Sequence, residues 1–271
     1  MKGAGDMATL TARVLPMPVR SHGWRIVERN FLLYRRNWIV FLSGFLEPVF
    51  YLFSIGVGVA ALVGDLVVNG ETVPYTVFVA PAMLAASAMN GAIVDSTYNI
   101  FFRMKYAKLY DSVLATPLRP WDVATGEVTW ALLRGGVYST GFLLVMLAMG
   151  LVDSWFAVLA LPATLLIGFA FAGVGMALTT FMRSWQDFEF VQLAILPMFL
   201  FSATFYPLSA YPTALQWVVE LTPLYRSVVL CRELVTGVLS WGSLVSVVYL
   251  LVMGGVGLYV ASGRLGKLLL K

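Results

Sequence analysis

The sequence predicts an all-α integral membrane protein with six transmembrane helices. Of the 271 residues, 60% are hydrophobic and only 12% are charged, and the mean hydropathy is +0.84. A soluble domain carries about 25% charged residues. Several apolar runs reach the roughly 20 residues that a helix needs to cross the hydrocarbon core. These runs do not alternate in polarity as barrel strands do, and lipid offers no partner to free backbone groups, so the spans are expected to be helices.

Six stretches meet the length requirement of a spanning helix. The predicted spans are residues 38–63, 75–101, 128–150, 155–181, 188–206 and 242–261. The first 20 residues lack the continuous apolar region of a cleavable signal, so the first span is expected to act as its own insertion signal. No extended Ser/Gly/Pro-rich linker divides the chain. We therefore expect a cytoplasmic N-terminus, residues 1–37, followed by one six-span domain, residues 38–271.

Basic residues predict the orientation, because Lys and Arg accumulate in cytoplasmic segments. The segments 64–74 and 151–154 contain none, and the longer segment 207–241 contains only Arg226 and Arg232. All other Lys and Arg residues fall on the opposite side of the predicted spans. This predicts a multi-pass protein of the cell (cytoplasmic) membrane with both termini in the cytoplasm.

An amphipathic helix is expected before the first span. Apolar and aromatic residues recur there at three- and four-residue steps: Trp24, Val27, Phe31, Tyr34 and Trp38. Arginines such as Arg25 and Arg29 fill much of the rest, which is typical of a helix that lies in the membrane interface with its cations toward anionic headgroups. The alternative is an early start of the first span.

A polar segment between the second and third spans predicts a short cytoplasmic helix. Its apolar residues follow a one-faced helical repeat: Tyr106, Leu109, Tyr110, Val113 and Leu114. Thr116 precedes a proline and is expected to end the helix. Pro120 then begins the next helix, and Asp122 suits the positive end of its first turn.

The segment between the fifth and sixth spans is too long for a simple turn. Thr213–Leu221 and Leu224–Thr236 each carry a helical apolar repeat, with Thr222-Pro223 as a cap and Gly237 as a stop. Neither is long enough to span, so we expect an extracellular re-entrant helical hairpin, the alternative being a cap that lies flat on the membrane. Its unusual charges are expected to shape an exit or to pair with one another and with Glu220: Arg226, Arg232 and Glu233.

Several motifs in this order resemble the permease subunits of type-2 ABC exporters, over essentially the whole chain. They are LEPVFYLF (46–53), YTVFVAPAM (75–83), LATPLRPWDVATGE (114–127), FYPLSAYP (205–212), LTPL (221–224) and Arg232-Glu233. The subgroup that the chain resembles is the nodulation-type lipo-oligosaccharide permeases, with the daunorubicin-resistance-type permeases next. The resemblance implies a substrate that is an amphiphile moved outward: a glycolipid, a lipo-oligosaccharide or a hydrophobic drug.

The resemblance also implies partners. A second copy or a related permease would pair with this chain among membrane lipids, and two cytoplasmic ATPase subunits would bind ATP and Mg beneath them. The family's coupling helix, which docks on the ATPase, corresponds to Tyr106–Thr116, with Tyr110, Val113 and Leu114 as the expected contacts. Trp24 and Arg29 of the interfacial helix would also touch the ATPase. Nucleic acid is not an expected partner.

The residues themselves point to an external energy source. A nucleotide-binding loop needs the pattern GxxxxGK[ST], and the glycine-rich stretch 168–180 has no lysine. We therefore expect this chain not to be an enzyme and to bind no cofactor. A single cysteine, Cys231, and a single histidine, His22, offer no cluster for a metal.

Polar and aromatic residues within the spans are candidates for the substrate path. Glu47 lies about nine residues into the first span, where an ionisable group usually faces the bundle interior; it is either functional or a structural partner near the inner surface. Asp95 is expected to be structural and to pair with an Arg or a Tyr. Four aromatic residues could line the path or belong to an interfacial belt: Phe50, Tyr51, Tyr206 and Tyr211.

Three rival functions remain open from the sequence. An ATP-independent ion-coupled carrier or channel would need paired charges within the spans and would depend on Glu47. A membrane enzyme would need a polar site with bases near the interface. A sensor or assembly subunit would transport nothing itself.

Overall fold

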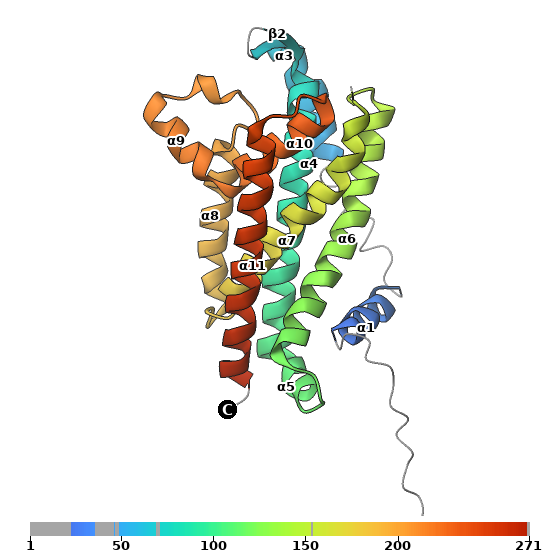
Figure 1. Cartoon of the computed structure of the whole chain (residues 1–271), viewed down its shortest axis with the longest axis vertical. Helices are drawn as coiled ribbons and strands as arrows, with labels where there is room; N and C mark the ends of the chain where they lie inside the picture. The colour runs from blue at the N-terminus through green and yellow to red at the C-terminus, as the bar shows by residue number, and fades with distance from the viewer. Residues whose placement is uncertain (1–22, 36–45, 47–48, 69–70, 153, 270–271) are drawn as a thin grey trace, which may run out of the picture.

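The structure is a computed structural model that describes residues 23–35, 46, 49–68, 71–152 and 154–269. Long helices run roughly alongside one another, with α5, α1 and the C-terminus toward one end and the β-strands and α10 toward the other (Figure 1). The α-helices are α1 (Trp24–Arg35), α3 (Ala60–Val63), α4 (Tyr75–Val94), α5 (Leu109–Leu114), α6 (Pro120–Ala148), α7 (Ala160–Thr179), α8 (Phe188–Phe201), α9 (Thr213–Leu221), α10 (Pro223–Thr236) and α11 (Trp241–Leu269). Tighter or wider helical turns are η1 (Ser54–Val59), η2 (Asp95–Asn99), η3 (Phe102–Tyr106), η4 (Trp155–Leu159), η5 (Trp185–Asp187) and η6 (Leu208–Ala210).

Four helices in the described part of the chain are long and apolar enough to cross a membrane. They are Tyr75–Tyr106, Pro120–Ala148, Trp155–Thr179 and Trp241–Leu269. The predicted first span lies partly outside the described residues, and α8 has only 14 residues. Helix α8 ends at Phe201, and Ala203 just beyond it adopts a left-handed φ of 51°. The structure therefore shows a multi-pass helical protein, and the expected total of six spans stays a prediction.

The helix that contains the third predicted span begins at Pro120, as predicted, and so extends eight residues ahead of the span expected from residue 128. Proline suits a first helical turn, and Asp122 accepts a hydrogen bond from the Arg119 backbone N–H at 2.9 Å. The placement of Asp122 in this first turn is confirmed. The second span likewise continues through π-helical turns to Tyr106 rather than ending at residue 101.

A small β-hairpin occupies the segment that was expected to be a loop. Strands β1 (Asp65–Val68) and β2 (Glu71–Pro74) pair antiparallel, with Leu66 opposite Val73. The prediction of an entirely helical chain is wrong at this point. Valine and threonine, which favour strands, fill much of both segments.

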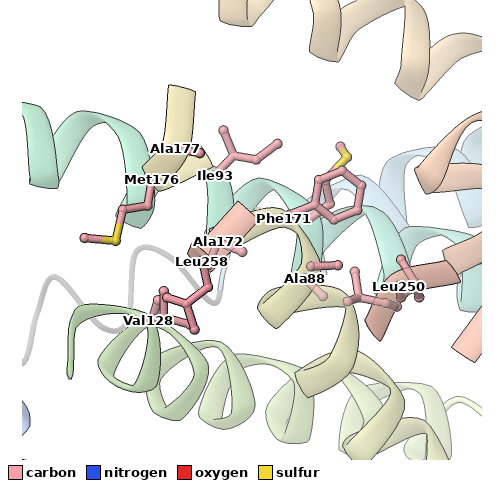
Figure 2. Close-up of a cluster of buried hydrophobic side chains, with 14 of the residues drawn as sticks. Ala88, Ile93, Val128, Phe171, Ala172, Met176, Ala177, Leu250 and Leu258 are labelled. Atoms are coloured by element: carbon pink, nitrogen blue, oxygen red, sulfur yellow. The ribbon is translucent and has the colours of Figure 1, made fainter. Parts of the chain in front are cut away.

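The core lies where α4, α6, α7 and α11 meet. Figure 2 shows its buried apolar side chains, among them Phe171 and Met176 of α7 and Leu250 and Leu258 of α11. Helices α7 and α11 approach closely because glycines face one another: a Cβ added to Gly257 would lie 2.5 Å from the carbonyl carbon of Gly173. Small residues allow such contact between membrane helices, where dispersion between close-packed backbones is a principal source of association.

Helices α9 and α10 form the expected pair after α8. The Thr222 hydroxyl accepts a hydrogen bond from the Tyr225 N–H, and Gly237, with φ 83°, ends α10. Helix α10 packs against α4 and α11, whereas α9 leaves Trp217 and Leu221 each 70% exposed. The two helices are confirmed, and their re-entrant position in a membrane stays a prediction.

Candidate functional site

A buried carboxylate on α6 joins four segments at the α5 end of the bundle. Glu127 is only 4% exposed. Its carboxylate accepts hydrogen bonds from Asn30 Nδ2 (2.9 Å), Arg29 Nη2 (3.2 Å), the Tyr110 hydroxyl (3.0 Å) and Arg103 Nη1. These donors come from α1, α5 and η3. We refer to Glu127 and its four donors as the Glu127 hub.

Backbone geometry brings the four donors together. A Cβ on Gly126 would lie 2.6 Å from the Gly23 carbonyl oxygen, so only a glycine lets α1 lie this close to α6. Asn30 and Arg29, two turns along α1, then reach Glu127. On the other side Lys108 adopts a left-handed φ of 45°, which turns α5 away from the direction of η3. Tyr110 consequently points into the bundle.

Burial and the neighbouring carboxylate keep the Tyr110 phenol protonated. Burial raises the pKa of the Tyr110 phenol well above its ordinary value, and the neighbouring Glu127 carboxylate raises it further. The phenol therefore stays protonated and donates to Glu127. A buried carboxylate is stable only when its partners satisfy it, and here two arginines, an amide and a phenol do so.

Replacing Tyr110 by phenylalanine is the mildest test of the Glu127 hub, because it removes a single hydroxyl group. Tyr110→Phe removes one hydrogen bond to a charged acceptor, so the free energy of unfolding should fall by about 1.5–3 kcal/mol. The measurement is the thermal midpoint of the purified chain in detergent. Tyr106→Phe is the matched control, because Tyr106 is 61% exposed, and it should leave the midpoint unchanged. Equal midpoints for all three proteins would contradict the assignment.

A second buried ion pair lies two turns along the same face of α6. Arg134 Nη2 pairs with Asp95 of η2, which also accepts from Asn99 Nδ2 at 2.8 Å. Arg134 Nη1 donates to the Tyr34 hydroxyl of α1 at 3.1 Å. The expectation that Asp95 pairs with an Arg is confirmed. Both pairs therefore connect α6 to α1 and to the end of the second span.

Comparison with known proteins places this geometry in a family. The sequence model of the ABC-2 type transporter family matches residues 22–235. The chain belongs to the ABC-2 type transporter family. It is similar to nodulation protein J of Rhizobium leguminosarum bv. viciae, with 34% identity over 83% of this chain and 86% of that protein. Nodulation protein J of Sinorhizobium fredii is 35% identical over 80% of this chain and 82% of that protein. Nodulation protein J of Rhizobium meliloti is 31% identical over 83% of this chain and 85% of that protein.

The segment predicted to be a coupling helix differs from its prediction in two respects. Helix α5 is shorter than Tyr106–Thr116, and Tyr110 is fully buried, so its expected role as an exposed contact is wrong. Leu109, Val113 and Leu114 pack against the core. The apolar face of α5 covers the end of the bundle, and this contact is favourable because it removes apolar surface from water.

The outward face of α5 is consequently polar. Asp111 and Ser112 of α5 are exposed, as are Ala115 and Thr116 directly after it, and the Thr116 hydroxyl donates to the Val113 carbonyl at 2.5 Å. On α1, Trp24 is 47% exposed, whereas Arg29 is committed to Glu127. These exposed residues are what α5 and α1 offer to a partner.

The predicted path residues fall into two separate places. Glu47 and Trp38 lie outside the described residues. Phe50 and Tyr51, just before η1, are 64% and 49% exposed. Tyr206 and Tyr211 lie between α8 and α9 with ring centroids 5.0 Å apart, and Tyr211 is buried with its hydroxyl directed to the Leu200 carbonyl. The ring contacts described for this chain join Tyr206 to Tyr211 and neither of them to Phe50 or Tyr51.

The charges of the α9–α10 hairpin do not pair as expected. Arg232 donates to the carbonyl oxygens of Ala203 (3.1 Å) and Phe78 (3.3 Å), and its guanidinium lies 3.8 Å from the centroid of the Phe78 ring. Glu233 accepts from the Ser240 N–H and hydroxyl and from the Ser243 hydroxyl, which fixes the start of α11. Arg226 lies over the Tyr225 ring at 5.8 Å. The predicted pairing of these charges with one another is therefore wrong, because backbone carbonyls bind Arg232 and the Ser240 and Ser243 groups bind Glu233. That the three charges shape an exit stays a prediction.

Of the five hub residues, Arg29 and Tyr110 were predicted as functional from the sequence, whereas Glu127, Arg103 and Asn30 were not. Glu127 ends the polar block 114–127 immediately before an apolar run. An ionisable residue at the edge of a span is a functional candidate by default, and this signal alone could have identified it.

Proposed function

We propose that this chain is the membrane-spanning permease subunit of an ABC exporter that moves an amphiphile outward across the cytoplasmic membrane. The substrate would be a lipo-oligosaccharide, a related glycolipid or a hydrophobic drug. A separate ATPase, in two copies, would bind ATP and Mg, and a second copy of this chain or a related permease would complete the membrane part. Membership of the ABC-2 type transporter family and similarity to nodulation proteins J support this proposal.

The observation that carries the mechanism is the Glu127 hub. It ties α5, the proposed coupling helix, to the spanning helix α6 and to α1 through hydrogen bonds to one buried carboxylate. A push on α5 would therefore move α6 and α1 as a unit rather than bend a loop. The α5 end of the bundle would face the cytoplasm, as the distribution of basic residues predicts, and the α9–α10 hairpin would dip into the outer leaflet.

The buried charges argue against the rival carrier. An ion-coupled carrier needs carboxylates that can change protonation during transport. Glu127 and Asp95, the carboxylates buried in the described part of the chain, are each ion-paired with arginine, so neither is free to bind a coupling ion. Glu47 stays the residue on which a carrier mechanism would depend.

Substitution on the outward face of α5 tests the coupling role. Ala115→Trp places a large side chain where the ATPase would dock, so copurification with the ATPase and substrate-stimulated ATP hydrolysis should be lost while the thermal midpoint is kept. Val67→Trp is the control, because Val67 is 68% exposed on the β-hairpin at the opposite end. Normal assembly and hydrolysis by Ala115→Trp would contradict the proposal.

A further inference from the structure

An apolar cavity of about 480 Å³ lies between α7 and α8. This volume falls within the roughly 300–1,000 Å³ that small-molecule sites occupy. Ile93 of α4 and Phe171 of α7 form its deep wall, and Ala194 and Met198 belong to its α8 wall. Pro223 of α10 also lines it.

The cavity exists because α8 packs loosely on the rest of the chain. Only Phe188 and Val191, in its first turn, are buried. Farther along, the small side chain of Ala194 faces the cavity, while Leu193 and Leu196 on the other side of the helix are 70% and 61% exposed. Beyond its first turn the helix makes only partial contact with the core, through side chains such as Ile195 and Met198.

The rim of the cavity opens toward the surface that would face lipid. Leu178, Phe181 and Phe190 line the cavity and are themselves 48%, 55% and 71% exposed. A buried water needs two to four polar partners. Of the two polar side chains that line the cavity, Thr97 donates to the Ile93 carbonyl, and Asp187 accepts the N–H groups of Arg183 and Ser184. The interior thus suits hydrocarbon and not water.

Cationic groups stand at the Asp187 end of the cavity. The Arg264 guanidinium lies 3.6 Å from the centroid of the Phe181 ring on the rim, and it donates to the hydroxyl of Thr180 at 3.1 Å. Arg183 is exposed two residues beyond Phe181. Neither guanidinium forms an ion pair within the residues that the structure describes. Asp187 offsets part of this charge, but backbone N–H groups already occupy its oxygens and hold the pKa of its carboxyl below the ordinary value.

We propose that this cavity binds an acyl chain of an anionic glycerophospholipid, whose phosphate group Arg264 and Arg183 hold at the rim. The acyl chain fills the space between α7 and α8. Its dispersion contacts with Phe171, Ala194 and Met198 supply the contacts that these side chains lack when the cavity is empty. The lipid thereby acts as a packing partner for α8, whether or not the protein is an exporter.

Retention of lipid by the purified full-length chain tests the acyl site. The chain is reconstituted with equal amounts of phosphatidylglycerol and phosphatidylcholine and washed in detergent. The lipid that it retains is then quantified by mass spectrometry. Ala194→Trp fills the cavity and should lower retained phosphatidylglycerol at least about tenfold, which corresponds to about 1.4 kcal/mol. Leu196→Trp, on the lipid-facing side of α8, should retain as much as the unmodified chain.

The headgroup is tested by removing its cations. The double variant Arg183→Gln/Arg264→Gln should lose the preference for phosphatidylglycerol over phosphatidylcholine, whereas Arg119→Gln, an exposed arginine at the start of α6, should keep it. Val174→Trp, on the α7 wall of the cavity, repeats the filling test should Ala194→Trp fail to fold.

Three results would overturn the proposal. Equal lipid retention by Ala194→Trp and Leu196→Trp would show that lipid binds elsewhere. Equal retention of the two phospholipids by the unmodified chain would show that no site recognises the anionic headgroup. Disulfide cross-linking between two copies carrying Ala194→Cys, in bilayers, would show that a second copy covers the groove.

Discussion

Glu127→Ala is expected to lower the free energy of unfolding by about 3–5 kcal/mol, because it leaves buried cations without their carboxylate. Arg103, whose side chain is 15% exposed, would have no counter-ion in the hub, and the Tyr110 hydroxyl would lose its acceptor. In the proposed exporter the same substitution should also disconnect α5 from α6, so ATP hydrolysis by the bound ATPase should no longer respond to substrate.

Two further variants separate the hub from a general effect of losing charge. Glu127→Gln keeps an acceptor for Tyr110 and should cost less than Glu127→Ala. Glu28→Ala removes a carboxylate whose partner, Arg25, lies 3.4 Å away at the surface, with side chains 61% and 52% exposed; such pairs contribute about 0–1 kcal/mol. Thermal midpoints and the substrate-stimulated ATPase rate are the measurements. A Glu127→Ala protein as stable as Glu28→Ala would exclude the hub as a structural link.

The long helices could be predicted from the sequence because hydropathy sums over many residues. Four predicted spans correspond to α4, α6, α7 and α11 within a few residues at most ends. Helix ends were less predictable from hydropathy, since α11 runs to Leu269, eight residues beyond the predicted end of its span, whereas the start of α6 at Pro120 followed from the proline and Asp122. The β-hairpin was also predictable in principle: Asn69-Gly70 separates two runs rich in Val and Thr, and Asn-Gly between such runs is a strong hairpin signal.

The Glu127 hub could not be predicted from local pattern. Asn30 and Glu127 are 97 residues apart, and Tyr110 meets Glu127 only because Lys108 turns the chain. Periodicity correctly grouped Tyr110, Val113 and Leu114 on one face of α5. It could not tell whether that face meets a partner or the chain's own core, because both contacts bury the same apolar surface.

Gly257→Ala is expected to lower the free energy of unfolding by about 1–3 kcal/mol, the usual cost of overpacking. Its Cβ would lie 2.5 Å from the Gly173 carbonyl carbon, which is a backbone atom and cannot rotate away, so α11 must move off α7. Gly255→Ala, two residues earlier on the same helix, is the matched control: a Cβ there meets nothing within 4 Å. In a helix interior alanine is about 1 kcal/mol more favourable than glycine, so Gly255→Ala should be neutral or stabilising.

The difference in stability between Gly257→Ala and Gly255→Ala shows whether close backbone contact joins α7 and α11. Both add the same methyl group and gain the same helical propensity, so only the contact with α7 distinguishes them. Gly173→Ala approaches from the other helix, with its Cβ 2.6 Å from the Gly254 carbonyl oxygen, and should resemble Gly257→Ala in the thermal midpoint. If Gly257→Ala and Gly255→Ala melt together, α7 and α11 tolerate a wider spacing, and close backbone contact is not what joins them.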